Sequence, residues 1–238
     1  RRQRQMCIRD RHYIYANYKK EKIKDDTIII KLKGSAGQSL GAFLTKGICI
    51  TVEGDCNDYV GKGMSGGEIV IRPRESETYE WSKNTIAGNT CLYGATGGHL
   101  FAAGTAGERF GVRNSGAVAV VEGLGDHGCE YMTGGLIISL GKTGVNFGAG
   151  MSGGLAFIYD EDGHFDQRYN PAMVDIERLS ESGEIDALKK VISAHANATT
   201  SPLARTLLGD WENTVAKFWK VVPHPSSPET PKNVLMLE

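Results

Sequence analysis

The feature that most constrains this chain is a glycine followed by a short apolar run, repeated with a nearly constant period. Each run, such as residues 48–52 (ICITV) or 136–140 (LIISL), is too short for a helix and rich in β-branched residues, which predicts a strand. Glycine before a strand permits the positive φ or bulged backbone of a tight corner. The glycines that open the runs lie 20, 31, 18, 19 and 19 residues apart: Gly47, Gly67, Gly98, Gly116, Gly135 and Gly154.

The single long step contains a charged segment, residues 72–83 (RPRESETYEWSK). It includes Pro73, the only one of seven prolines in an interval that holds 28 of the 31 glycines, Gly34 to Gly154. Removing these twelve residues restores the period, because 31 − 12 = 19. We therefore expect residues 72–83 to form a surface loop inserted into a regular array.

A strand that recurs every 18 to 20 residues without a helix between copies restricts the fold. A doubly wound sheet needs a crossover of about a dozen residues or more between parallel strands. If each repeat instead forms one turn of a solenoid, successive copies stack about 4.8 Å apart and apolar side chains line the interior. The pattern predicts a mainly β protein, a single-stranded right-handed parallel β-helix of about seven turns with a C-terminal α-helical segment.

An antiparallel sandwich also has short strands at even spacing. Sandwich loops vary in length and chemistry, whereas these connections repeat one glycine pattern. Gly34-x-x-Gly37-x-x-x-Gly41 recurs from Gly104 and again from Gly141. The constant phase favours the β-helix.

The rest of the chain divides around this array. We expect the β-helix domain over residues 13–170, a helical cap over 171–222 and a disordered tail over 223–238. Residues 1–12 show no hydrophobic period and are expected to be a non-native or disordered leader. In the cap, residues 184–197 predict one helix, and Ser201-Pro202 begins a second. The second carries an apolar stripe suited to covering the open end of the solenoid: Leu203, Leu207, Trp211, Val215 and Phe218.

Composition argues against several classes of function. Residues 1–33 hold eleven Lys and Arg against four Asp and Glu, but no aromatic platform or recognition helix accompanies them, so we expect no nucleic-acid partner. No apolar run is long enough to predict a membrane span. The five cysteines are widely spaced without a Cys-x-x-Cys pair, which predicts a cytoplasmic protein without a metal site.

Two segments, 61–66 and 148–153, match the dinucleotide fingerprint G-x-G-x-x-G. That fingerprint needs a helix opening on its last glycine to hold the pyrophosphate, and here each copy leads into a strand. Both occupy the same phase of the repeat, which indicates a structural corner. We therefore predict no cofactor-binding residue in this chain.

Two further motifs allow a chemical interpretation. Residues 126–130 (DHGCE) place a carboxylate, an imidazole and a thiol together, as a thiol nucleophile with a base would require. Polar groups in a repeat turn can equally cap unpaired backbone, and we favour that role. Two dipeptides in a glycine-rich turn, Glu108-Arg109 and Arg113-Asn114, carry charges that could bind an anion, but an exposed or interfacial ion pair is commoner. We predict no catalytic residue, and the important residues are the six glycines above together with Gly150.

The longer motifs resemble one family. Residues 34–44, 54–71, 88–98, 106–135 and 146–160 are similar to the carboxy-terminal GXGXG-type β-helix domain of the glutamate synthase large subunit, and the resemblance extends over about residues 13–222. A related β-helix occurs in a subunit of formylmethanofuran dehydrogenase and in free-standing proteins. The alternative is therefore a stand-alone β-helix binding protein or such a subunit.

The resemblance implies a structural domain or fragment of glutamate synthase, which converts glutamine and 2-oxoglutarate to two glutamates in ammonia assimilation. Its implied role is to hold the amidotransferase and FMN-barrel domains together, whether these lie upstream in one chain or in separate subunits. FMN, an iron–sulfur cluster and NAD(P)H or ferredoxin are implied for the complete enzyme. None of these cofactors is implied for this chain, which is expected to be non-catalytic alone.

Replacing a corner glycine tests the repeat. We expect Gly150→Val to lower the melting temperature, because a left-handed corner strains a β-branched residue by about 1 to 3 kcal/mol. The surface substitution Lys142→Ala should change stability by no more than about 0.5 kcal/mol. Thermal melts of the two variants decide this, and equal midpoints would show that Gly150 is not at a corner.

Overall fold

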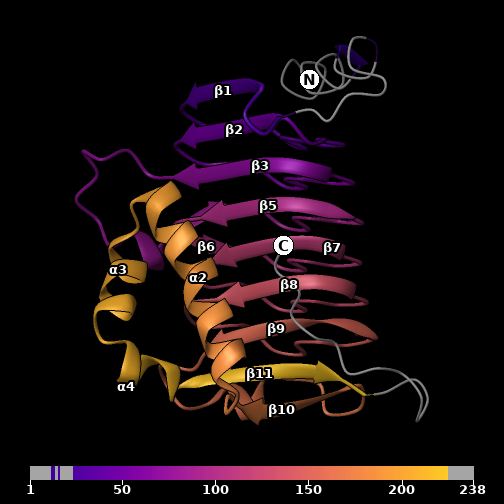
Figure 1. The fold of residues 1–238 in the computed structure, drawn as a ribbon, viewed down its shortest axis with the longest axis vertical. Coiled ribbons are helices and arrows are strands. Elements are labelled where there is room, and N and C mark those ends of the chain that lie inside the picture. The colour runs from indigo at the N-terminus through magenta and orange to yellow at the C-terminus, as the bar shows by residue number, and fades with distance from the viewer. Residues whose placement is uncertain (1–11, 14–15, 17–23, 225–238) are drawn as a thin grey trace.

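The computed structural model describes residues 12–13, 16 and 24–224. Seven parallel strands stack in chain order into the sheet of a solenoid (Figure 1). This confirms the predicted parallel β-helix of about seven turns. The strands are β1 (Ile28–Lys33), β2 (Ile48–Glu53), β3 (Ser65–Arg72), β5 (Gly97–Ala102), β7 (Ser115–Val121), β8 (Thr133–Ser139) and β9 (Gly153–Tyr159). A short second sheet joins β4 (Thr85–Ala87) to β6 (Thr105–Ala106).

The core follows from the register of these strands. Alternate side chains of β2 point inward, and Ile50 and Val52 stack on Ile69 and Ile71 of the next coil. All four are completely buried. Burying such a side chain stabilises the fold by about 1.5 to 3 kcal/mol. The apolar ladder of the interior is therefore the main stabilising element of the solenoid.

Most of the glycines that open the strands have a left-handed backbone. Gly67 has φ +79°, and a Cβ there would lie 2.5 Å from the carbonyl oxygen of Ile48 on the preceding coil. Positive φ angles also occur at four of the others: Gly47, Gly98, Gly135 and Gly154. Glycine at Gly67 thus meets two demands, an unusual φ and a close approach of the neighbouring backbone.

Gly116 and Gly150 differ from this pattern. Gly116 is not among the residues with positive φ, and His99 pairs with Val118, so the register of this coil is one residue later than the spacing of the glycines indicated. A Cβ on Gly116 would still lie 2.2 Å from the carbonyl oxygen of Thr96. Gly150 has φ +69°, and its nearest obstacle is the exposed ring of Tyr131, which can move. Strain at Gly150 therefore arises mainly from the backbone angle.

The inserted segment lies outside the stacked coils. Residues 74–80 are all exposed, and a short 3₁₀ helix, η1 (Trp81–Lys83), follows them. Arg72 itself ends β3, pairs in register with Glu53 and donates to its carboxylate at 3.0 Å. The exposed segment is therefore shorter than residues 72–83, because Arg72 still belongs to the sheet.

The C-terminal region contains both helices and strands. β11 (Phe218–Pro223) pairs antiparallel with β9, and β10 (Val174–Arg178) pairs with β11, so this pair closes one end of the solenoid. The helices α2 (Ser182–Thr199), α3 (Pro202–Gly209) and α4 (Trp211–Val215) lie beside the sheet (Figure 1). Of the leader expected over residues 1–12 and the tail expected over 223–238, residues 1–11 and 225–238 fall outside the described residues, whereas Pro223 belongs to β11 and the His224 amide donates to the Met173 carbonyl.

The predicted second helix needs correction. It is interrupted at Asp210, and Phe218 lies in β11. Its apolar side chains pack on the outer face of the sheet, in one cluster with Ile138 and Phe157, and the strands β10 and β11 close the end. The outer face of β8 and β9 is itself apolar, so it requires a helical cover.

A buried polar contact fixes the helices to the solenoid. Glu122 follows β7, His195 lies on α2 and Ser201 is the N-cap of α3, and all three are almost fully buried. The Ser201 hydroxyl donates to the Glu122 carboxylate and accepts from the Ala204 amide at 3.0 Å. His195 Nε2 lies 3.5 Å from the same carboxylate. Ser201 thus caps α3 and donates a hydrogen bond to the buried Glu122 carboxylate.

We expect Ser201→Ala to destabilise the protein by about 1 to 3 kcal/mol, because it removes a helix cap and a partner of a buried carboxylate. Thr206→Ala, on an exposed position of α3, is the matched control. Urea unfolding measures both. Equal unfolding free energies would show that the contact does not hold the helices.

Candidate functional site

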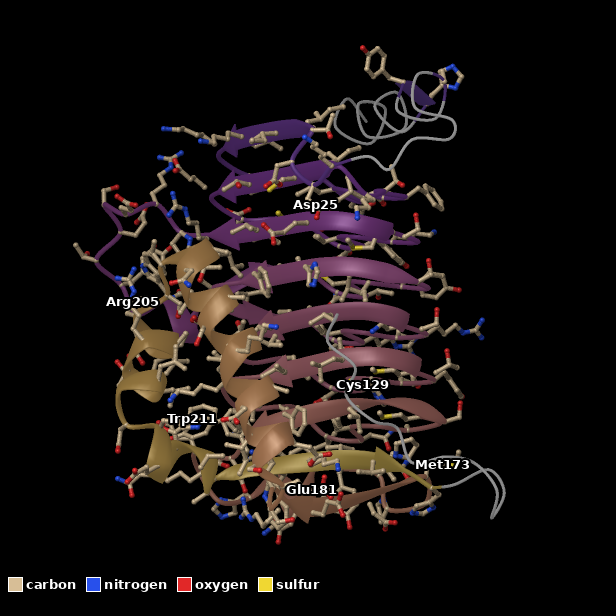
Figure 2. The ribbon with its side chains drawn as sticks, in the orientation of Figure 1. Asp25, Cys129, Met173, Glu181, Arg205 and Trp211 are labelled. Atoms are coloured by element: carbon tan, nitrogen blue, oxygen red, sulfur yellow. The ribbon has the colours of Figure 1, made fainter. Side chains whose placement is uncertain are left out.

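The group at residues 126–130 does not form a nucleophile with its base. Cys129 lies in the turn region of the solenoid (Figure 2), is fully buried, and its burial raises the thiol pKa far above its ordinary value. His127 Nδ1 lies 3.1 Å from Nδ2 of the Asn146 side chain. A thiolate is the reactive form of cysteine, so this environment makes Cys129 inert.

Asp126 belongs instead to a series of side chains that cap the next coil. Its Oδ1 accepts from the Val145 amide at 2.8 Å. Asp58 accepts from the Asn89 amide, and Asn89 accepts from the Glu108 amide, both also at 2.8 Å. These contacts satisfy turn amides that would otherwise lack a partner. The polar residues of the turns therefore have a structural use.

The two dinucleotide-like segments occupy equivalent corners. The first leads into β3 at Ser65 and the second into β9 at Gly153. Neither is followed by a helix. The helix N-terminus that would bind a pyrophosphate is thus missing at both places.

The charged residues at 108–114 have separate environments. Arg109 pairs with Glu130 at 3.7 Å. Asn114 is fully buried and bonds both the amide and the carbonyl of Ala117, at 3.0 and 2.9 Å. Arg113 is exposed, and its guanidinium lies 6.0 Å from the centroid of the Tyr131 ring. Of the two arginines in this segment, only Arg113 has no ion pair with a carboxylate among the described residues.

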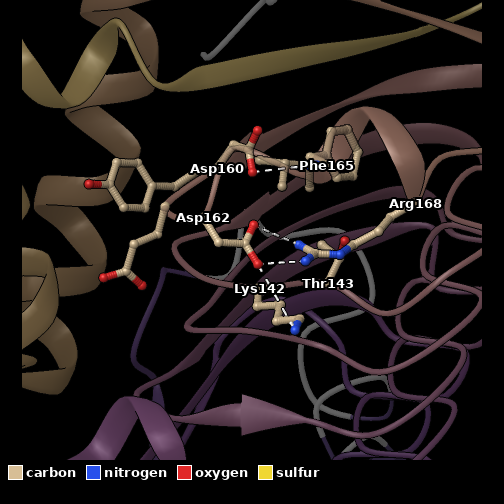
Figure 3. Close-up of a pocket in the computed structure, with 9 residues that line it drawn as sticks. Lys142, Thr143, Asp160, Asp162, Phe165 and Arg168 are labelled. Atoms are coloured by element: carbon tan, nitrogen blue, oxygen red, sulfur yellow. Dashed lines mark hydrogen bonds and ion pairs between the residues drawn. The ribbon is translucent and has the colours of Figure 1, made fainter.

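A small pocket of about 80 Å³ lies near the closed end of the solenoid (Figure 3). Its lining includes Lys142, Thr143, Asp160, Asp162 and Arg168. Arg168 donates twice to Asp162, at 3.0 and 2.5 Å, and Asp160 accepts from the Trp219 indole at 3.0 Å. Sites for small-molecule ligands usually measure roughly 300 Å³ or more. Its size and paired charges indicate a structural junction.

The described residues contain no group of three or more His, Cys, Asp or Glu side chains arranged to hold a metal ion. No helix in the described part of the chain is both long and apolar enough to cross a membrane.

The coiled sheet and its glycine corners define the structural class of the protein, a parallel β solenoid with a helical flank. A family model described as GXGXG motif matches residues 2–224, and the chain belongs to this family.

Several relatives of this chain are glutamate synthases. The chain is 51% identical over 210 residues to the NADH glutamate synthase of Schizosaccharomyces pombe, with 88% of this chain and 10% of the relative aligned. It is 56% identical over 196 residues to the NADPH glutamate synthase large chain of Azospirillum brasilense, covering 82% and 13%. It is 50% identical over 209 residues to the chloroplastic ferredoxin-dependent enzyme of Spinacia oleracea, covering 88% and 13%. The chain thus spans about a tenth of the length of these relatives.

The pair of Asp162 and Arg168 predicts a pH dependence. The guanidinium holds the Asp162 pKa below its ordinary value of about 3.9, so the pair stabilises the fold above that pH and loses its contribution as pH falls through the lower, folded-state pKa. Since Asp162 is 39% exposed, we expect Asp162→Asn to cost less than about 1 kcal/mol at pH 7.

Melts of wild type, Asp162→Asn and the exposed control Glu161→Gln between pH 7 and pH 2 measure this effect. The difference between wild type and Asp162→Asn should shrink as the medium becomes acidic. A constant difference would contradict the assignment.

Proposed function

We propose that this chain is the carboxy-terminal structural domain of a glutamate synthase large chain and supplies no catalytic residue of its own. The observation that carries the proposal is 50–56% identity to glutamate synthases over 82–88% of this chain, within an aligned segment that is only 10–13% of each relative. The structure adds that the candidate thiol of Cys129 is buried and that Arg109 is paired with Glu130. These features suit a scaffold.

The proposed role is to hold an amidotransferase domain and an FMN-barrel domain in a fixed relation. A solenoid suits this role because each coil is bonded to the next in its turns as well as in its strands. The Phe43 amide donates to the Lys62 carbonyl and the Gly63 amide donates to the Tyr93 carbonyl, both at 2.8 Å. A body bonded in this way deforms little, so it would keep the domains attached to it at fixed relative positions. The partner domains would lie in the same chain or in associated subunits.

The overall reaction of the proposed enzyme converts glutamine and 2-oxoglutarate to two glutamates. FMN, an iron–sulfur cluster and the electron donor, NAD(P)H or ferredoxin, would be bound by its other parts. A cytoplasmic location is a further part of this proposal, although the spinach relative is described as chloroplastic.

A chimera tests the scaffold role. We expect the Azospirillum brasilense large chain to lose glutamate formation when its homologous segment is deleted and to regain it when residues 24–224 of this chain are inserted. The same chimera with Gly67→Val should regain little, because that glycine cannot accept a side chain. Failure of the wild-type chimera despite correct folding would contradict the proposal.

The purified chain provides the complementary measurement. We expect no flavin absorbance after incubation with FMN and no release of ammonia from glutamine. Stoichiometric FMN binding would contradict the assignment of a non-catalytic scaffold.

A further inference from the structure

One outer corner of the solenoid carries a row of equivalent residues, one from each of six coils. We call this row the corner stack: Phe43, Gly63, Gly94, Arg113, Tyr131 and Gly150. Coil-to-coil bonds define it. The Gly94 amide donates to the Val112 carbonyl at 3.3 Å, and the Arg113 amide donates to the Glu130 carbonyl at 2.9 Å. Each member therefore sits directly over the next.

Every member of the corner stack has a left-handed backbone, which favours glycine. Phe43, Arg113 and Tyr131 nevertheless have φ angles of 60°, 53° and 54°. The two aromatic rings gain packing in return. A Cβ on Gly63 would lie 2.8 Å from the Phe43 ring, and one on Gly150 would lie 2.4 Å from the Tyr131 ring. Arg113 is exposed, so burial does not account for its position.

Two cations lie at this corner without a carboxylate partner. Lys62, which precedes Gly63, has its Nζ 5.4 Å from the Tyr59 ring centroid and 5.6 Å from that of Tyr93. Arg113 lies against Tyr131 in the same way. Among residues 24–224, no acidic side chain forms an ion pair with either cation, whereas nearby Arg109 is paired with Glu130. The rings restrain these long side chains and leave their charge unneutralised.

The backbone between the two cations is bare. Gly94 lies on the coil between those of Lys62 and Arg113, and a Cβ placed there would meet nothing within 4 Å. Two coil steps separate the cations, a distance of about 10 Å along the solenoid axis. The surface thus offers two positive charges on either side of an unobstructed position, with tyrosine rings beside both.

We propose that this corner, formed by Lys62, Gly94, Arg113, Tyr93 and Tyr131, is a docking site for an acidic polypeptide segment of a partner protein. An extended segment running along the axis places alternate side chains about 6.8 Å apart, within reach of both long cationic side chains. Carboxylates complement the two charges, and the tyrosines supply apolar contact. The inference stands on these contacts alone and does not depend on the glutamate synthase assignment.

Nucleic acid fits the corner less well. Binding to a phosphate backbone depends on a series of neutralised phosphates, whereas this corner offers two cations, Lys62 and Arg113. A short acidic segment matches two charges. The two partners are distinguishable by experiment.

A fluorescein-labelled oligoglutamate peptide is the probe, titrated with the full chain at about 0.1 M salt, where the Debye length is about 10 Å, and followed by anisotropy. We expect Lys62→Gln combined with Arg113→Gln to weaken binding about tenfold. The control combines Lys190→Gln with Arg205→Gln, two exposed cations on α2 and α3, and makes the same change in net charge. It should alter affinity by no more than about twofold.

A charge-retaining variant, Lys62→Arg with Arg113→Lys, should keep the affinity, and thermal melts establish that each variant is folded. The proposal is overturned if the wild-type chain does not bind the peptide, or if the control loses as much affinity as the corner variant. It is also overturned if a single-stranded oligodeoxynucleotide binds more tightly than the peptide through the same two residues.

Discussion

The hydrogen bonds between successive coils are the constraint on which the rest of this structure depends. They hold neighbouring backbones about 4.8 Å apart around the whole circumference. No side chain fits where a carbonyl of one coil faces the Cα of the next, as between Ile48 and Gly67 or between Thr96 and Gly116. The same spacing stacks Ile50 on Ile69 and so builds the apolar interior. Glycine corners and core ladder are two results of one geometry.

The period could be predicted because this constraint leaves its mark on the sequence at every coil. The exact phase could not always be predicted. At residues 115–117 a small residue occurs at three successive positions, and only the pairing of His99 with Val118 shows the register in which this strand stacks on the preceding one. The surface on which the helices pack could also not be predicted from the sequence. An apolar stripe indicates that a helix is covered, but the choice between the end of the solenoid and the face beside Phe157 depends on tertiary contacts.

The residues of the turns could likewise be interpreted only in part from the sequence. Adjacent residues in a turn point in different directions, and the structure places Cys129 in the core and His127 beside Asn146. The corner cations were missed, because Lys62 and Arg113 are far apart in sequence and the exposed insertion shifts their relative phase. Aligning the coils with that insertion removed would have shown one signal, an arginine at a position where other coils have Gly63, Gly94 and Gly150.

The antiparallel pair β10 and β11 gives the solenoid a defined end after β9. A parallel coil is a template for one more coil of the same kind, but a strand running the other way ends the series. Each repeat between β1 and β11 adds about 4.8 Å, so the number of repeats sets the distance between these two strands. Duplication or loss of one repeat would move whatever is attached at one end relative to the other, without changing either attachment surface.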